Sequence, residues 1–499
     1  MTELLDSFPW ASTLVVLPLV GGLLTLRVTD LRARRRIGVV FAALELGLAA
    51  ILAAALVASP LGRPIEDLGP EGPGGLRWHL GLDDLNAPFL PLAAAIVLLV
   101  LVAAPRRELG GAMVPVVLLT EATTMGVYTS LDATTLALFW IACLAPGAYA
   151  LREAIPGHGA GRARRAYGVF LGLGALPIVA AVVLLGMARA GAGAAHPFDI
   201  GPDAALAPVP VSAQASIFFL LAVALLVRKA VLPFHSWLPV LTERGPIAVT
   251  ALLIGTHLGA FLASRMMLPL LPEASGRYVS YLADLALVSA LYGALLGLAQ
   301  QDLRRMLGFV LTSQMGLVMV GVGEANRESL HGALLEMLAL GLTSTGMLLL
   351  VAQLEARAGT TDVRRLGGAA ARWPFLAGSF FVMAIASVGF PGSLMFVSED
   401  LLLHGLLGAH PLEATGLLLV TALNGITLVR GFYLAFLGTP RRDLGTYVPD
   451  LLPRERAVAV VLTAVLLVTG LAPTPLLRAR ELVVRQLALE GAEHVPVTH

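Results

Sequence analysis

The stretch IFFLLAVALLVRKAVLPFHSWLP, residues 217–239, decides how the chain folds. It opens with eleven apolar residues, 217–227, and then places two positive charges, Arg228 and Lys229, directly against them. Pro233 follows four residues later, and a proline inside a helix removes a backbone hydrogen bond and kinks or breaks the helix. The pattern predicts a membrane-spanning helix that is interrupted beside two cations.

Lys229 is the only lysine among 499 residues, and arginine supplies every other basic side chain in the count of 34. Burial lowers the pKa of a lysine, whereas arginine effectively never releases its proton. A charge at a helix centre costs about 2.5–3.5 kcal/mol on insertion scales, so such a residue is usually retained for a use. We predict that Lys229 carries protons through a membrane. The alternative is compositional drift, in which a GC-rich gene converted lysine to arginine and left one survivor.

The composition indicates an all-α, polytopic membrane protein. Hydrophobic residues make up 57% of the chain and charged residues 13%, whereas soluble domains carry roughly 25% charged residues. Apolar runs long enough to cross about 30 Å of hydrocarbon recur from end to end. The single cysteine, Cys143, excludes a disulfide framework and any iron–sulfur or zinc site built by this chain alone.

About fourteen spans are predicted from these runs. They fall at residues 9–27, 38–58, 86–104, 112–129, 133–151, 166–188, 213–238, 246–268, 278–299, 305–322, 328–353, 374–405, 413–437 and 456–473. We expect four sections: three N-terminal helices (1–111), a first five-helix repeat (112–268), a second five-helix repeat (278–437), and a last helix with its tail (438–499).

The loops alternate in charge, and this predicts the orientation. Connections after odd-numbered spans carry Arg32, Arg34, Arg35, Arg36, Arg106, Arg107, Arg162, Arg164, Arg165, Arg304, Arg305, Arg364, Arg365, Arg441 and Arg442. Connections after even-numbered spans carry few, namely Arg63, Arg77, Arg189, Arg277 and Arg327. Positively charged loops stay in the cytoplasm. We therefore expect both termini to lie outside the cytoplasm.

Three segments are expected outside the membrane on that outer face. Residues 59–85 and 189–212 are rich in glycine, proline and acids, and we expect them to form small caps. Residues 476–489 alternate Arg and Glu with Leu and Val, which fits either an amphipathic helix on the interface or a frayed terminus.

Two predicted spans are interrupted in matching ways. The seventh breaks at residues 231–235, which include Pro233 and His235, and the twelfth at residues 389–393, which include Pro391 and Gly392. Ionisable residues flank both breaks: Arg228 and Lys229 at the first, and Glu399 and Asp400 at the second. Matching interruptions in two halves of a chain indicate inverted repeats with an ion site at each break. The alternative is a plain helix kink with a charge that snorkels to the interface.

Several motifs, in order along most of the chain, resemble the antiporter-like subunits of respiratory complex I and of Mrp-type sodium/proton antiporters, and the subunit M branch in particular. They are LRWHLGLDDLNAPF (76–89), VRKAVLPFHSWLP (227–239), QQDLRRMLGFVLTSQMG (300–316), ALLEMLALGLTSTGMLLLVAQLEARAGTTDVRRLGG (333–368) and VGFPGSLMFVSED (388–400). The resemblance implies two inverted five-helix repeats with broken helices 7 and 12.

The resemblance also implies a midplane line of proton-transfer residues. Ungapped counting from the proline puts Arg228 on the family's seventh-span lysine, but a one-residue bulge restores Lys229, which can cycle its proton. His257 takes the place of an eighth-span lysine, and histidine titrates near neutral pH. The alternative for His257 is a packed or pore-lining histidine without proton traffic. Glu399 matches the family's twelfth-span glutamate.

Two positions depart from the family pattern. Ile141 occupies the place of the fifth-span glutamate that pairs with the seventh-span lysine, and Glu121 of the fourth span is a candidate substitute. Leu340 occupies the place of an eleventh-span polar residue, while Glu336 lies one turn earlier on the same face. These departures leave open whether this chain couples proton movement as its relatives do.

The remaining polar residues have simpler interpretations. Arg430 is expected to pair with Asp400 or Glu399, either in the path or as a structural bridge. His331 and His404 are expected at the interface, and Arg304 and Arg305 are expected to set topology.

The resemblance therefore leads us to expect a proton-translocating, non-redox membrane subunit of a complex I-type NADH:quinone oxidoreductase in the inner membrane of a prokaryote. We expect other membrane subunits and lipid as partners, no nucleic acid, and no cofactor or metal in this chain. The alternatives are a subunit of an Mrp-type cation/proton antiporter or of a proton-driven inorganic-carbon uptake complex, and a structural scaffold that has lost conduction.

Overall fold

A computed structural model describes residues 8–58, 64–72, 77–153, 160–202, 204, 209–439 and 448–492. Three arginines on which the orientation prediction relies, Arg63, Arg441 and Arg442, lie outside these residues. The described chain is mostly helical. Its helices, with π- and 3-10 turns marked η, are α2 (Trp10–Leu26), α3 (Leu31–Ala58), α4 (Phe89–Ala103), α5 (Met113–Thr129), α6 (Ala133–Ala142), α7 (Leu144–Glu153), α8 (Ala160–Ala166), η2 (Tyr167–Leu171), α9 (Gly172–Gly191), α10 (Val211–Arg228), α11 (Trp237–Arg244), α12 (Ile247–Gly255), α13 (Leu258–Leu262), η4 (Ala263–Met267), α14 (Leu268–Leu270), α15 (Pro272–Leu298), α16 (Leu303–Glu324), α17 (Arg327–Ala358), η5 (Ala369–Ala371), α18 (Pro374–Ala386), α19 (Leu394–Leu407), α20 (Pro411–Phe436), α21 (Pro453–Leu471), α22 (Thr474–Arg478) and α23 (Glu481–Ala492).

The helical, multi-pass class predicted from composition is confirmed. Within the described residues, nine helical segments are long and apolar enough to cross a membrane, and four shorter apolar helices accompany them. Each of the fourteen predicted spans overlaps a helical segment. The number of crossings and the division into four sections remain predictions.

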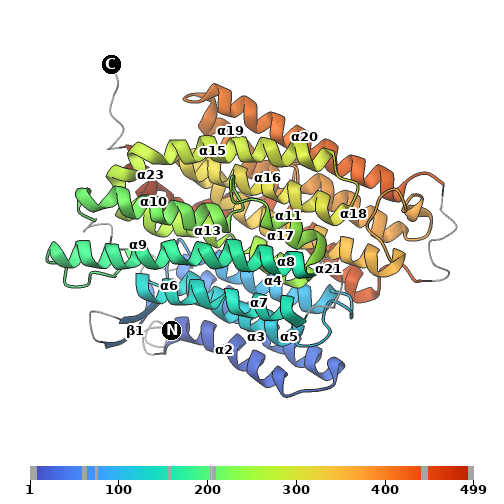
Figure 1. The fold of residues 1–499 in the computed structure, drawn as a ribbon, viewed down its shortest axis with the longest axis horizontal. Helices are drawn as coiled ribbons and strands as arrows, with labels where there is room; N and C mark the ends of the chain where they lie inside the picture. The colour runs from blue at the N-terminus through green and yellow to red at the C-terminus, as the bar shows by residue number, and fades with distance from the viewer. Residues whose placement is uncertain are drawn as a thin grey trace.

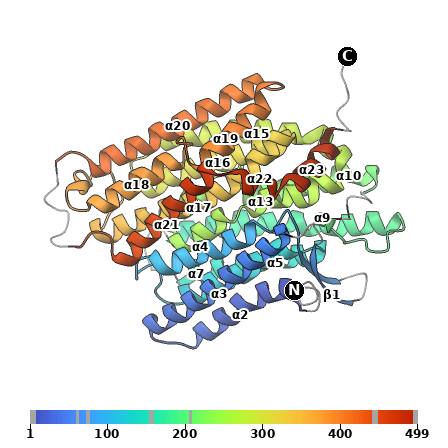
Figure 2. The same cartoon turned by 180° about the vertical axis from the view of Figure 1, so that it is seen from behind.

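The helices lie side by side with their axes roughly aligned (Figures 1 and 2). Helices α2 and α3 occupy one edge of the array and α20 the opposite edge, while α16, α17 and the segment α12–α14 are almost wholly buried between them. Glycine permits the closest crossing there. A Cβ atom on Gly255 or on Gly341 would meet the other residue's carbonyl oxygen at 3.3 Å or 2.7 Å. Helices α12 and α17 therefore meet backbone to backbone.

The predicted cap at residues 59–85 contains a β-hairpin. Strands β1 (Ile65–Glu71) and β2 (Arg77–Leu82) pair antiparallel, with Ile65 opposite Leu82. The hairpin is tied to the bundle through Asp67, whose Oδ2 accepts the backbone N–H of Ser12 at 2.6 Å. The sequence prediction named a cap but no strands. In both ribbon views, β1 and α23 lie toward the same end of the helix array (Figures 1 and 2).

The C-terminal segment forms helix α23, so the structure favours the amphipathic helix over the frayed terminus. Val484 and Leu487 are buried where α23 packs on α14, α15 and α17. Glu481 fastens its first turn, because its carboxylate accepts hydrogen bonds from Arg485 Nε at 2.6 Å, from His331 Nε2 at 3.0 Å and from Arg327.

We expect helix α23 to detach from the bundle at low pH. Hydrogen bonds from Arg485, and then from Arg327 and His331, hold the pKa of the Glu481 carboxyl at about 2, below its ordinary value of 4.5. A depressed carboxyl pKa stabilises the docked state above the undocked pKa, and that contribution is lost as pH falls from about 4.5 toward 2. Amide hydrogen exchange, corrected for its intrinsic pH dependence, should show α23 opening over that window while α17 stays protected. Since Glu481 is partly exposed, we expect local opening and not global unfolding.

Glu481→Gln is the matched control for this prediction. It should open α23 at pH 7 and remove the pH dependence. Equal protection of α23 at pH 7 and pH 3 in the unmodified chain would contradict the assigned role of Glu481.

Candidate functional site

The first predicted break lies between α10 and α11. The chain leaves helical geometry after Arg228 and resumes it at Trp237, with Ala230 in the left-handed region at φ 52°. Two side chains take up backbone groups freed by the break. The Leu232 N–H donates to Ser289 Oγ at 3.1 Å, and the Trp237 indole donates to the carbonyl of Val227 at 2.9 Å.

The two cations at this break point to different neighbours. Lys229 is 1% exposed, and its Nζ lies 2.9 Å from His257 Nδ1 and 2.9 Å from Met315 Sδ. The Arg228 guanidinium instead donates to Cys143 Sγ at 3.1 Å and lies 5.3 Å from the ring centroid of Trp140. Lys229 is therefore the cation that meets His257, a choice that the sequence left open.

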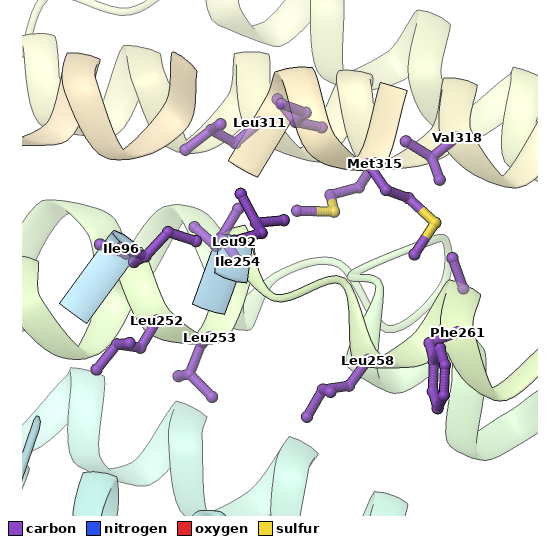
Figure 3. Close-up of a cluster of buried hydrophobic side chains, with 14 of the residues drawn as sticks. Leu92, Ile96, Leu252, Leu253, Ile254, Leu258, Phe261, Leu311, Met315 and Val318 are labelled. Carbon is purple, nitrogen blue, oxygen red and sulfur yellow. The ribbon is translucent and has the colours of Figure 1, made fainter. Parts of the chain in front are cut away.

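His257 itself lies at a break that the sequence analysis missed. Helix α12 ends at Gly255, α13 begins at Leu258, and His257 adopts φ 49°. Figure 3 shows the ribbon leaving its helical course between Ile254 and Leu258. Left-handed backbone is uncommon outside glycine and is concentrated at functional sites. The Tyr128 hydroxyl compensates the break by donating to the carbonyl of Thr256.

Gly259 makes room for the lysine at this second break. A Cβ atom at Gly259 would lie 2.6 Å from Lys229 Cγ and 3.2 Å from its Cδ, so the lysine stem runs directly along the glycine backbone. The flanking glycines of His257 in GTHLG were the available sequence signal for this arrangement.

Apolar side chains from four helices surround the His257 break. Figure 3 labels Leu92, Ile96, Leu252, Leu253, Ile254, Leu258, Phe261, Leu311, Met315 and Val318 in this cluster. His257 Nε2 is buried there and has no hydrogen-bond partner among the described residues. A low-dielectric surrounding strengthens the interaction between Lys229 and His257 and raises the cost of any unpaired polar atom.

Two glutamates continue from Lys229 toward the second break. Glu336 on α17 is fully buried, and neither of its carboxylate oxygens has a hydrogen-bond partner in the described residues. It lies close enough to interact electrostatically with both Lys229 and Glu399. Lys229 therefore contacts His257, and Glu336 interacts electrostatically with both Lys229 and Glu399, so that these four side chains from distant parts of the sequence form one line.

The second predicted break lies between α18 and α19. Pro391 falls in the non-helical stretch, and Gly389 and Gly392 adopt φ 70° and 93°. The Glu399 carboxylate folds back onto this stretch, because a Cβ atom on Gly389 would lie 2.4 Å from Glu399 Oε2. Asp400 does not join it. Asp400 is exposed and lies 3.6 Å from His404 Nδ1.

Glu121 is not brought to Lys229. It is fully buried on α5, and within the described ranges neither of its oxygens has a hydrogen-bond partner. Its electrostatic neighbour is Glu45 of α3, which is likewise buried. Ile141 is 41% exposed on the surface of α6, so this position does not face Lys229. Leu340 is buried in the core cluster. Glu45 was missed, although it is a lone acid in an apolar run.

The expected pairing of Arg430 with Asp400 or Glu399 is wrong. Arg430 Nη1 donates to the carbonyl of Gln300 at 3.0 Å. Helices α19 and α20 are joined by a short turn, with Asp400 seven residues before the end of α19 and Arg430 nineteen residues into α20. At 1.5 Å per residue, Arg430 lies about 18 Å further from that turn.

Four other polar residues lie off this line. His331 is buried beneath α23 and contacts Glu481, whereas His404 is exposed, and the place of both at the membrane interface remains a prediction. His235 packs edge-on against Tyr292, with ring centroids 4.9 Å apart. Arg304 is buried, donates to the carbonyl of Thr242 at 2.8 Å and pairs with Glu355 at 3.0 Å.

Comparison with known proteins matches this arrangement to one family. The family described as NADH:quinone oxidoreductase/Mrp antiporter, TM matches residues 202–425. NADH-quinone oxidoreductase subunit 13 of Thermus thermophilus is 32% identical over 92% of this chain and 94% of its own length. The chain belongs to this family. Subunit M of Pseudomonas aeruginosa is 30% identical over 71% of this chain and 70% of its own length.

Comparison with solved structures supports the same family and fold. A chain of respiratory complex I from Thermus thermophilus with bound NADH superposes with a TM-score of 0.86 at 29% identity, covering 96% of this chain and 99% of that one. A chain of the Mrp complex from Dietzia sp. superposes with a TM-score of 0.80 at 21% identity, over 98% of both, which shows a common fold. The protein is an antiporter-like, multi-pass membrane subunit, and its predicted resemblance to the subunit M branch is confirmed.

Proposed function

We propose that this chain translocates protons as the antiporter-like membrane subunit of a complex I-type NADH:quinone oxidoreductase. The observation that carries the proposal is the 2.9 Å contact between Lys229 Nζ and His257 Nδ1, formed where two interrupted helices meet. Other membrane subunits are the partners that such a role requires.

The contact supports a direct proton transfer. A neutral His257 with its proton on Nε2 accepts the lysine proton at Nδ1, and the resulting imidazolium can release a proton from Nε2. The return step restores the ammonium. Because no hydrogen bond between described residues joins Lys229 to Glu336, transfer along that branch requires water or side-chain movement.

Electrostatic coupling supplies the driving step. A proton arriving on Lys229, Glu336 or Glu399 changes the energy of charge on its neighbours, and a membrane potential of 100 mV contributes about 2.3 kcal/mol per charge. Backbone groups freed at the two proline breaks can hold the water that links these side chains. Glu336 provides the acid near Lys229 that position 141 lacks.

The orientation and internal symmetry form part of the proposal. The end of the helix array opposite the β-hairpin and α23 is rich in arginine, since it carries Arg106 and Arg107 after α4 and Arg304 and Arg305 at the start of α16. We therefore place that end in the cytoplasm. Both termini then lie outside, in the inner membrane of a prokaryote. Helices α5–α14 and α15–α20 would form two inverted five-helix units, because the breaks at Pro233 and Pro391 hold equivalent places.

Substitution of Glu336 tests the function. In vesicles containing the full chain, Glu336→Gln should reduce potential-driven proton flux at least about tenfold, because the amide keeps the shape but cannot exchange a proton. Glu243→Gln is the matched control, since Glu243 pairs with Arg244 at the rim and lies off the line.

Equal fluxes in the Glu336→Gln variant and the unmodified chain would overturn the proposal. Replacing external potassium by sodium separates a cation/proton antiporter from a proton carrier, because only the former should then show sodium-dependent flux. A protein that conducts in neither condition, whatever stands at position 336, would be a scaffold.

A further inference from the structure

The C-terminal segment inserts a buried, unpaired cation into the helix bundle. Arg480 lies between α22 and α23, is 1% exposed, and all three of its guanidinium nitrogens are buried without a hydrogen-bond partner among the described residues. A charge buried without a partner is strongly unfavourable. We therefore look for a role of Arg480 other than anchoring the C-terminal segment.

The guanidinium rests on an aromatic cluster made of Phe89, Tyr128 and Phe261. Its carbon lies 4.6 Å from the ring centroid of Phe89, and Phe89 stacks on Tyr128 with centroids 5.6 Å apart. Phe261 packs edge-on against Tyr128 at 4.9 Å. Cation–π contact of this kind holds the charge in place without neutralising it.

The aromatic cluster joins Arg480 to the His257 break. The Tyr128 hydroxyl donates to the carbonyl of Thr256, the residue before His257, and Phe261 lies in α13 just after it. One aromatic layer therefore separates the fixed positive charge from the strained backbone that presents His257 to Lys229.

Arg480 differs in this respect from a second buried arginine near the break. The other buried arginine of the region, Arg265, lies 5.4 Å from the ring of Phe261 and is neutralised by Asp83, with Nη2 2.9 Å from Oδ1. No acidic side chain in the part of the chain that the structure describes pairs with Arg480.

We propose that Arg480 is an electrostatic barrier that limits passive return of protons to His257 from the membrane side on which α23 lies. A fixed cation in a low-dielectric surrounding raises the energy of any proton or metal cation that approaches it, and channels exclude cations in this way. The inference rests on the proposed function, since it assumes a proton route through His257. Glu481, which anchors α23 to Arg327 and His331, holds the barrier in place.

The test measures passive proton leak through the full chain in vesicles, after a pH jump and without a membrane potential. Arg480→Gln should raise the leak about tenfold, the effect of lowering a barrier by roughly 1.4 kcal/mol. Arg480→Lys does not serve as a charge-preserving control, because burial without a partner lowers the pKa of a lysine and favours its neutral form. Arg478→Gln is the control, because it removes an exposed arginine from the same segment.

A leak in folded Arg480→Gln equal to that of the unmodified chain would overturn the barrier. If Arg480→Gln does not fold, Glu481→Gln takes its place. It should raise the leak by opening α23, and an unchanged leak with α23 open by hydrogen exchange would equally overturn the proposal.

A double variant separates this inference from the proposed function. Adding Glu336→Gln to Arg480→Gln should return the leak to the low level, because protons that pass the barrier still need the buried line. If Glu336→Gln alone leaves flux unchanged, the proposed function fails. If it lowers flux while Arg480→Gln changes nothing, only the barrier fails.

Discussion

Proton flux through the Lys229→Arg variant should fall at least about a hundredfold, although the substitution keeps the positive charge. Arginine does not release its proton under conditions in which proteins work, so it cannot alternate between donor and acceptor beside His257. Lys229→Ala should lose flux to the same extent, because it removes the group that contacts His257 Nδ1. The measurement is potential-driven acidification of vesicles that contain the full chain, followed with a pH-sensitive dye.

The adjacent cation offers the control for this experiment. Arg228→Lys changes a side chain that contacts Cys143 and Trp140 and points away from His257. We expect it to keep most of the flux. The opposite pattern, in which Lys229→Arg conducts normally and Arg228→Lys does not, would contradict Lys229 as the proton carrier.

The sequence predicts the helices and two of the three helix breaks, because each of these leaves a recognisable pattern of apolar, basic or proline residues. Apolar runs and arginine-rich loops locate the helical segments, because hydrocarbon excludes unpaired backbone and charge. Proline marks two breaks, at Pro233 and Pro391, because it lacks a backbone donor. The third break, at His257, has no proline. This break is compensated by the Tyr128 hydroxyl, which donates a hydrogen bond to the carbonyl of Thr256, 128 residues away in the sequence.

The direction of each side chain was the least predictable part of the site. Successive residues on a helix point about 100° apart, so one of a charged pair faces the interior and the other faces elsewhere. Lys229 meets His257 while Arg228 meets Cys143, and Glu399 reaches the break while Asp400 is exposed. Which member turns inward depends on where the helix ends, and helix α10 ends at Arg228.

Residues far apart in the chain account for what the sequence analysis missed. Glu45 carries a signal of its own, since it is a lone acid in an apolar helix, yet only the fold brings it near Glu121. Arg480 stands in a tail where arginine and glutamate alternate, so its composition predicts an exposed residue. The guanidinium rests on Phe89, which comes from the third predicted span and is far from Arg480 in the sequence.

Arg265→Met should be the most destabilising substitution outside the proton line. Arg265 and Asp83 form a buried ion pair, with side chains 5% and 7% exposed, that joins the exit of the β-hairpin to the end of the His257 span. Asp83 Oδ1 also accepts the backbone N–H groups of Leu85 and Asn86 at 3.1 Å and 3.0 Å. Removing the arginine leaves a buried carboxylate without its cation, at a cost of about 3–5 kcal/mol.

The double variant Asp83→Asn/Arg265→Met isolates that cost. The asparagine oxygen can keep the bonds to Leu85 and Asn86 while carrying no charge, so the double variant should recover most of the stability lost by Arg265→Met alone, since replacing both members of a buried pair is often nearly neutral. Thermal unfolding in detergent, compared across the four members of the cycle, measures the coupling between the two positions. Equal destabilisation in Arg265→Met and in the double variant would mean that Arg265 stabilises the bundle through its packing on Phe261 and not through Asp83.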